Sequence, residues 1–213
     1  SGSLWYSRKD FYFGDLVSAL LLSNYISLVH DNSLWTPIGP IDGWSLRLTI
    51  GPTFDFQRSK LHNYAGLLDF RYYYRINHYF SFAQRSMIWL NDGVDIRRFY
   101  IGGSWGLRGY AINQIYGRKA ILLNQELRFP FAKSLMLSIG SENIGFAPIR
   151  GALFIDAGNA WDYDYPGLRG SFGFGLRGLF MGGIVLRLDI GKRTDFRSIS
   201  ENWFTQFFFG WDF

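Results

Sequence analysis

Residues 183 to 191 read GIVLRLDIG, and this stretch decides the fold. Its even-numbered positions are all apolar, while the positions between them include the charged Arg187 and Asp189. The apolar positions are Ile184, Leu186, Leu188 and Ile190. Because neighbouring side chains of a β-strand point to opposite faces, the stretch predicts a strand with one apolar and one polar face.

The same alternation extends outward to most of the chain. From 121 to 131, apolar residues oppose Asn124, Glu126 and Arg128, and only Gln125 interrupts the apolar face. The segments 45–56, 65–76 and 170–180 follow the same rule. The pattern predicts eight strands, at about 44–56, 64–76, 79–90, 118–131, 149–158, 170–180, 183–192 and 203–213.

Composition indicates which class of all-β protein these strands form. Charged residues make up 18% of the chain, against about 25% in soluble domains, and aromatic residues make up 20%. No window approaches the roughly 20 apolar residues that a membrane-spanning helix needs. A soluble β-sandwich also alternates, but its outer face is seldom this aromatic. Because lipid-facing backbone must be satisfied internally, the sequence predicts an antiparallel transmembrane β-barrel.

Connection lengths predict the orientation of this barrel and its division into parts. With the C-terminus in the periplasm, Asn77–His78 and Met181–Gly182 become short inner turns, and 91–117, 159–169 and 193–202 become long external loops. The connection from Ala132 to Pro148 is longer than this rule prefers.

We expect a barrel domain at 44–213 and an N-terminal segment at 1–43. Within that segment, Ser1 to Ser3 are interpreted as a cloning remnant, and 4–40 form either a strand pair or a surface segment.

Several other functions are disfavoured by the sequence. The net charge is +5, but Lys and Arg are scattered, so we expect no nucleic-acid partner. Gly102 to Gly106 match the G-x-S-x-G pattern of serine hydrolases, yet no helix-forming run follows them. Gly173 to Gly178 match G-x-G-x-x-G inside an alternating strand, where glycines more often thin the wall. We therefore expect no enzymatic activity, no cofactor and no metal site.

The loop at 91–117, called the lock loop below, has an unusual composition for an external loop. Residues 101–110 read IGGSWGLRGY, which is rich in glycine, apolar and aromatic residues and holds a single charge at Arg108. A loop that extended into water would be more hydrophilic. The composition favours a segment folded into a cavity.

Three ordered motifs resemble the BamA/TamA-type outer-membrane assembly and secretion superfamily. Leu107 to Tyr110 match its L/V-R-G-Y/F loop signature, 124–130 (NQELRFP) look like its next strand, and 151–161 (GALFIDAGNAW) look like its F-x-D-x-G-x-x-W strand. The alternating aromatic ending Phe209, Trp211 and Phe213 resembles the family's C-terminal signal. The resemblance covers residues 44–213.

The resemblance implies both a site and a function. It implies that Arg108 enters the lumen and bonds Glu126 and Asp156, which the alternation places on the polar face. The remaining lock-loop motif positions are Gly102, Gly103, Leu107, Gly109 and Tyr110. It further implies a bacterial outer-membrane barrel that inserts or translocates client proteins, opening between its first and last strands. The alternative is a structural or pore-like barrel without insertase activity.

The family barrel has sixteen strands, and this chain matches its C-terminal half, with eight strands or with ten if the N-terminal segment adds a hairpin. No periplasmic POTRA domain is recognised in the sequence. The chain is therefore expected to be a fragment, a reduced barrel that closes alone, or one half of a homodimer. The expected partners are outer-membrane lipid, client outer-membrane proteins and a second copy.

Overall fold

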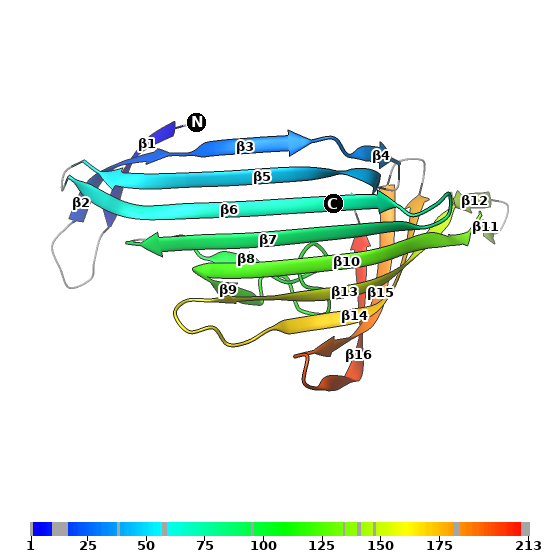
Figure 1. The fold of residues 1–213 in the computed structure, drawn as a ribbon. Coiled ribbons are helices and arrows are strands. Elements are labelled where there is room, and N and C mark those ends of the chain that lie inside the picture. Colours follow the sequence, from blue (N-terminus) through cyan, green and yellow to red (C-terminus); the bar gives the residue numbers. More distant parts are fainter. Residues whose placement is uncertain are drawn as a thin grey trace.

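The chain forms one long, strongly curved antiparallel sheet (Figure 1). The structure is a computed structural model. It describes residues 2–9, 17–37, 39–56, 59–94, 96–133, 135–139, 142–146, 148–180 and 184–209. The regular elements of these residues are all strands. No helix among them is long and apolar enough to cross a membrane.

Ten strands follow one another across the main sheet. Their order is β1 (Gly2–Lys9), β2 (Val17–Asn24), β5 (Gly39–Asp55), β6 (Lys60–Arg75), β7 (Ser81–Gly93), β10 (Lys119–Ala132), β13 (Ile149–Trp161), β14 (Arg169–Phe180), β15 (Ile184–Thr194) and β16 (Ile199–Phe209). Two further strands, β3 (Ile26–Asp31) and β4 (Leu34–Thr36), also pair with β5. The path thus ends at β1 on one side and at β16 on the other.

The all-β antiparallel barrel wall predicted from the sequence is confirmed, and each of the eight expected strands is present. The described N-terminal residues form strands, and the path of the main sheet holds ten strands. The long connection after β10 contains a hairpin of its own, β11 (Leu135–Ile139) with β12 (Glu142–Phe146). Their mutual pairing satisfies backbone groups that an irregular loop of this length would leave open.

The turns show how local chemistry sets the strand ends. In the short turn between β6 and β7, Asn77 Oδ1 accepts the amides of Tyr79 and Phe80 at 2.8 and 2.9 Å. Between β15 and β16, Asp195 Oδ1 accepts the amides of Arg197 and Ser198 at 2.9 and 2.6 Å. This tight turn replaces most of the loop expected at 193–202, so β16 begins four residues earlier than predicted. The turn expected at Met181–Gly182 lies outside the described residues.

The two faces of the sheet have opposite chemistry, and the polar face is the buried one. Along β10 every second residue from Ala120 to Arg128 is buried. Among the described residues, the charged side chains buried on this face are those of Asp55, Arg108, Glu126, Arg128, Asp156, Arg177, Arg187 and Asp189. The opposite face carries exposed apolar residues, among them Tyr72, Tyr74, Ile88, Leu90, Leu153, Ile155, Ile190 and Phe207.

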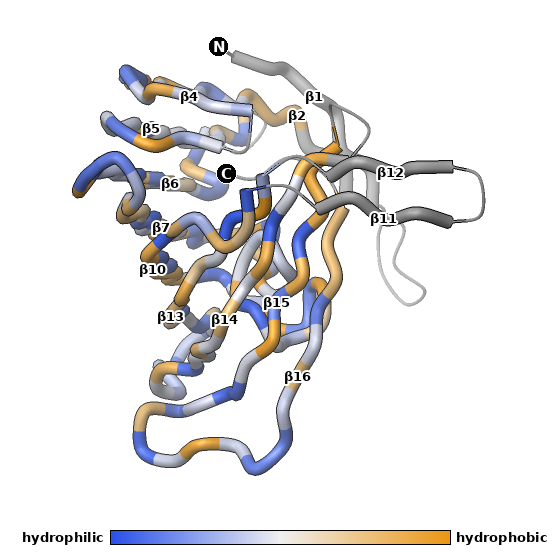
Figure 2. The backbone as a smooth tube through the Cα atoms, turned by 90° about the vertical axis from the view of Figure 1, so that its right-hand side faces the viewer, coloured by the Kyte–Doolittle hydropathy of each residue, from blue (hydrophilic) through white to orange (hydrophobic). Residues whose placement is uncertain are grey.

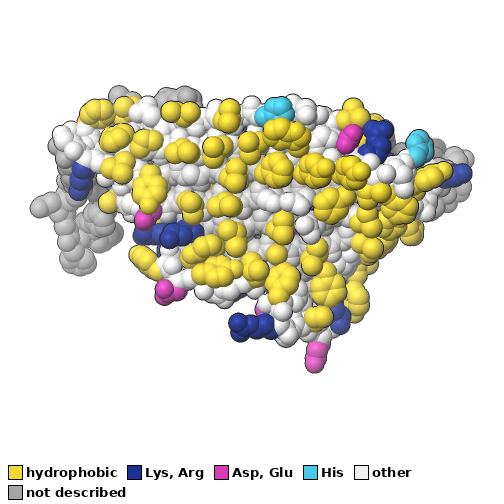
Figure 3. All heavy atoms as spheres, viewed as in Figure 1, with side chains coloured by type: hydrophobic (Ala, Val, Ile, Leu, Met, Phe, Trp, Pro, Cys, Tyr) yellow, Lys and Arg dark blue, Asp and Glu magenta, His cyan; other side chains and the backbone are white. Residues whose placement is uncertain are grey.

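The tube coloured by hydropathy shows this alternation along the curved strands (Figure 2). Hydrophobic side chains spread over the outer face of β5, β6, β7 and β10, where few charges interrupt them (Figure 3). Soluble monomers rarely expose so large an apolar surface, because it would be hydrated at a cost. A lipid bilayer is the solvent that suits this face, and the lumen then holds the charges.

Candidate functional site

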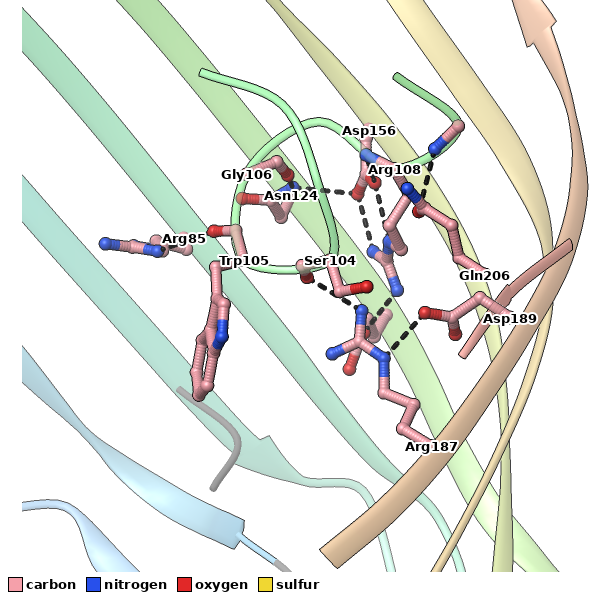
Figure 4. Close-up of polar contacts among 12 residues, drawn as sticks. Arg85, Ser104, Trp105, Gly106, Arg108, Asn124, Asp156, Arg187, Asp189 and Gln206 are labelled. Carbon is pink, nitrogen blue, oxygen red and sulfur yellow. Dashed lines mark hydrogen bonds and ion pairs between the residues drawn. The ribbon is translucent and has the colours of Figure 1, made fainter. Parts of the chain in front are cut away.

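The lock loop leaves the wall between β7 and β10 and folds back against the concave face of the sheet (Figure 4). Its two arms pair as a short hairpin, β8 (Phe99–Ile101) with β9 (Ile115–Gly117). Residues 102–114 form the tip between them. The loop therefore carries its own backbone pairing into the lumen.

Apolar packing explains the composition of the loop. Leu107 is completely buried and belongs to the hydrophobic cluster of the lumen. The other buried members of this cluster are Met87, Ile101, Ile115, Ala120, Leu122 and Ala160. Burying a leucine side chain contributes roughly 1.5–3 kcal/mol, which favours the folded-back loop over an extended one.

Arg108 lies at the centre of the polar contacts. Its Nε and Nη2 donate to Oδ2 and Oδ1 of Asp156 at 2.6 and 2.5 Å, and its Nη1 donates to Glu126 Oε1 at 2.6 Å. Its backbone amide adds a fourth bond, to Asp156 Oδ2 at 3.2 Å. The guanidinium also lies 3.8 Å from the ring centroid of Phe154, which faces it from β13. A planar fork that remains charged is suited to this paired geometry.

Glu126 receives more than one cation. Besides Arg108, it accepts Arg128 Nε at 2.9 Å and Arg177 Nη2 at 2.8 Å through Oε2. All four side chains are at most 3% exposed. One carboxylate thus joins the lock loop, β10 and β14 in a single buried network.

Three strands hold carbonyl oxygens of the loop tip. Asn124 on β10 donates to Gly106 O at 2.8 Å and also to Asp156 Oδ1 at 2.9 Å. Arg187 on β15 donates to Ser104 O at 3.0 Å, and Arg85 on β7 donates to Trp105 O at 3.2 Å. Figure 4 shows these side chains converging on the tip from different strands.

The last strand, β16, also holds the loop. Its Gln206 accepts a hydrogen bond from the Gly109 amide through Oε1 at 3.0 Å and donates one from Nε2 to Tyr110 O at 3.1 Å. Its Phe208 meets the Trp105 ring edge-on, with ring centroids 4.6 Å apart. The lock loop is therefore bonded both to the middle of the sheet and to its final strand.

Glycine is required at several positions of the tip. Gly102, Gly103 and Gly109 have φ angles of +124°, +75° and +85°. Residues that carry a Cβ rarely adopt such positive values. At Gly109 a Cβ would also lie 2.7 Å from the ring of Phe204 on β16. The motif glycines thus serve both the turn and the approach of the loop to the wall.

Replacing Gly109 by alanine should weaken the attachment of the loop. We expect a loss of about 1–2 kcal/mol from backbone strain and about 1–3 kcal/mol more from the clash with Phe204. Chemical unfolding followed by tryptophan fluorescence measures this loss. The matched control is Gly167→Ala, where φ is +92° but nothing lies within 4 Å of the added Cβ. Equal losses in the two variants would contradict a packing role for Gly109.

The structure brings Arg108, Glu126 and Asp156 together and places Leu107, Gly109 and Tyr110 against the wall. Phe209, the last described residue of β16, is 60% exposed, while Trp211 and Phe213 lie outside the described residues. The sequence prediction missed further residues that hold the loop or its partners, which are Arg85, Asn124, Arg128, Arg177, Arg187, Gln206 and Asp189, the last of which accepts Arg187 Nε at 2.7 Å. Asn124, Arg128, Arg177, Arg187 and Asp189 stood on polar faces of the predicted strands, so alternation was the signal that could have found them.

The two stretches that match enzyme motifs, G-x-S-x-G and G-x-G-x-x-G, also contribute residues to this site. Ser104, from the G-x-S-x-G stretch, offers its carbonyl oxygen to Arg187. Gly175, from the G-x-G-x-x-G stretch, faces the lumen, where a Cβ would lie 2.4 Å from Asp189 Oδ1. Gly173 pairs directly with Gly191 on the next strand. These glycines leave room for large lumen side chains, in keeping with a thinned wall.

An apolar outer face, a charged lumen and a loop folded into that lumen define a transmembrane β-barrel of the outer membrane. The family model described as the Omp85 superfamily domain matches residues 29–205. The chain therefore belongs to the Omp85 superfamily, and the resemblance found in its motifs is confirmed. It is a bacterial outer-membrane barrel related to protein insertion and translocation, and its family is not one of enzymes.

One solved structure illustrates the fold. The chain is similar to BamA from Haemophilus ducreyi lacking POTRA domains 1–3, with a TM-score of 0.61 and 17% sequence identity. The match covers 92% of this chain and 43% of that one, so this chain spans less than half of its length. No curated protein sequence matches the chain.

Proposed function

We propose that this chain forms part of a barrel that inserts or translocates client proteins, with the lock loop held in the lumen by Arg108, Glu126 and Asp156. The observation that carries the proposal is that the loop tip forms polar contacts with widely separated strands of the lumen wall. Its polar contacts extend from Arg85 on β7 to Gln206 on β16, passing through the buried carboxylates on β10 and β13. A loop that only closed a pore would not need to hold the last strand.

The last strand is the proposed site of client entry. Among the described strands β16 pairs with β15 alone, so its other edge presents backbone donors and acceptors. Such an edge is a template for a further strand. Trp203 and Phe207 on this strand are each 66% exposed and would face lipid. We infer that the lock loop, through Gln206 and Phe208, positions this edge.

The proposed partners follow from the two surfaces. Outer-membrane lipid covers the apolar outer face, and an unfolded client protein adds its strand at the edge of β16. A second copy of the chain is the other strand donor that fits this edge, which would give a homodimer. Mass measurement in detergent tests that arrangement, and a monomeric mass would contradict it.

Reconstitution tests the proposed function directly. We expect liposomes containing the protein to accelerate the folding of an added, urea-unfolded outer-membrane β-barrel client relative to empty liposomes. Protease resistance of the client over time is the measurement. An unrelated closed barrel, reconstituted at equal density, controls for disturbance of the bilayer.

The alternative is a pore-like barrel, which is favoured by a cavity of about 730 Å³ beside the loop tip. Arg71, Arg85 and Trp105 are among the residues that line it. Solute efflux from the same liposomes without faster client folding would support this alternative and overturn the insertion proposal.

A further inference from the structure

A second charged site lies at the rim of the lumen, at the end of the barrel that carries the turn between β6 and β7. A pocket of about 240 Å³ is bordered there by Arg75, Ser81 and Arg150, together with His78, Tyr79 and Phe80 of that turn and its edges. Among the described residues, none of these six forms a hydrogen bond or an ion pair with Arg108 or with the lock loop. The pocket is thus separate from the site described above.

Arginine side chains crowd this end of the wall. Arg150 on β13 is the direct partner of Arg177 on β14, and Arg177 is in turn the direct partner of Arg187 on β15. Like charges in directly opposed positions destabilise a sheet. A fold that keeps such a row needs negative charge nearby.

The acidic residues of the lumen compensate only part of this row. Glu126 pairs with Arg177, and Asp189 pairs with Arg187. In contrast, Arg75 and Arg150, the two arginines that border the pocket, have no acidic partner among the residues that the structure describes. The pocket therefore presents two guanidinium groups, the exposed one of Arg75 and the half-buried one of Arg150, that no described acidic residue pairs with.

A buried hydroxyl points to a ligand independently of the charges. Ser81 is 4% exposed, and its Oγ has no hydrogen-bond partner within the described residues. Buried polar groups are nearly always hydrogen-bonded, so an unsatisfied one calls for an explanation. Ser81 borders the same pocket as the two arginines, and a bound ligand oxygen would satisfy it.

We propose that this pocket binds a phosphate group, held by Arg75 and Arg150 and by the hydroxyl of Ser81. Guanidinium forks match phosphate oxygens bidentately, and two of them balance a free phosphate dianion or more than neutralise the single charge of a lipid phosphodiester. A hydroxyl donor supplies a further bond to the same group. The phosphate comes either from a free anion or from a lipid headgroup at the rim, where Tyr79 is 63% exposed beside the apolar outer face.

Isothermal titration of the protein in a maltoside detergent and phosphate-free buffer tests this site. The two probes are inorganic phosphate and a short-chain phosphatidylglycerol kept below its micelle concentration. We expect saturable binding of at least one probe, with each of Arg75→Gln and Arg150→Gln weakening it roughly tenfold, the effect of one lost charged hydrogen bond of moderate strength. Binding of the lipid tenfold tighter than the free anion would assign the headgroup as the source, and equal or weaker lipid binding would assign the free anion.

Arg197→Gln is the matched control, because it removes the same charge from an exposed turn at the other end of the strands. It should bind both probes like the unchanged protein. The Arg150→Gln variant should unfold at an unchanged or higher temperature, because it relieves repulsion from Arg177. Absence of binding by the unchanged folded protein, or an equal loss in Arg197→Gln, would overturn the proposal.

Discussion

Replacing Arg108 by alanine is expected to release the lock loop and to destabilise the barrel by about 3–5 kcal/mol. The reason is that the substitution leaves two fully buried carboxylates, Glu126 and Asp156, without the cation that bonds both of them. The unfolding midpoint in denaturant measures the energetic loss. Limited proteolysis measures the release of residues 102–114, which should become cleavable while the strands remain protected.

Two variants show whether the loss comes from this arrangement rather than from any lost ion pair. Arg98→Ala breaks a partly exposed pair with Asp162, 2.8 Å long, and should cost at most about 1 kcal/mol. Arg108→Lys keeps the positive charge but lacks the guanidinium fork. The unfolding midpoint of this variant should therefore lie between those of Arg108→Ala and the unchanged protein. An Arg108→Ala protein that is as stable and as protease-resistant as the unchanged one would eliminate the proposed lock.

Replacing Glu126 by glutamine should be at least as damaging, although the two side chains have nearly the same shape. Three buried guanidinium groups, those of Arg108, Arg128 and Arg177, then share no carboxylate at this position. Removing one partner from a buried ion pair costs about 3–5 kcal/mol. The midpoint of chemical unfolding is again the measurement, and the stability loss should exceed that of any single arginine-to-glutamine change in the trio.

Glu201→Gln makes the same chemical change at an exposed position of β16 and should alter stability by less than about 0.5 kcal/mol. The client-folding assay separates stability from function, provided that the folded fraction of each variant is equalised first. If Glu126→Gln unfolds at the same denaturant concentration as Glu201→Gln, the buried network does not stabilise the fold.

The wall could be predicted from the sequence because its signal is local. Most of the predicted strands repeat one rule, in which a residue such as Leu188 faces lipid and its neighbours Arg187 and Asp189 face the lumen. A barrel requires no more than this period of two, since every strand meets the same two environments. The family resemblance then supplied the pairing of Arg108 with Glu126 and Asp156, which no local pattern contains.

The errors lie where the structure depends on distant or specific contacts. Strand β16 was placed four residues too late, because the short turn is made by Asp195 and not by a glycine or proline. The hairpin of β11 and β12 was missed, since its strands pair only with each other. Gln206 could not be recognised as a loop contact, because its partners Gly109 and Tyr110 are 97 and 96 residues away.

The number of residues that separate the bonded partners along the chain affects how the barrel folds. The Arg108 bond to Asp156 spans 48 residues, and the Gly109 bond to Gln206 spans 97. The loop tip therefore cannot complete its contacts until β16, the last described strand, has joined the curved sheet. Non-local contacts of this kind slow folding, because chain entropy is lost before the contacts form. Closure of the lumen should thus be the final step of assembly, and until then the buried charges remain available to water.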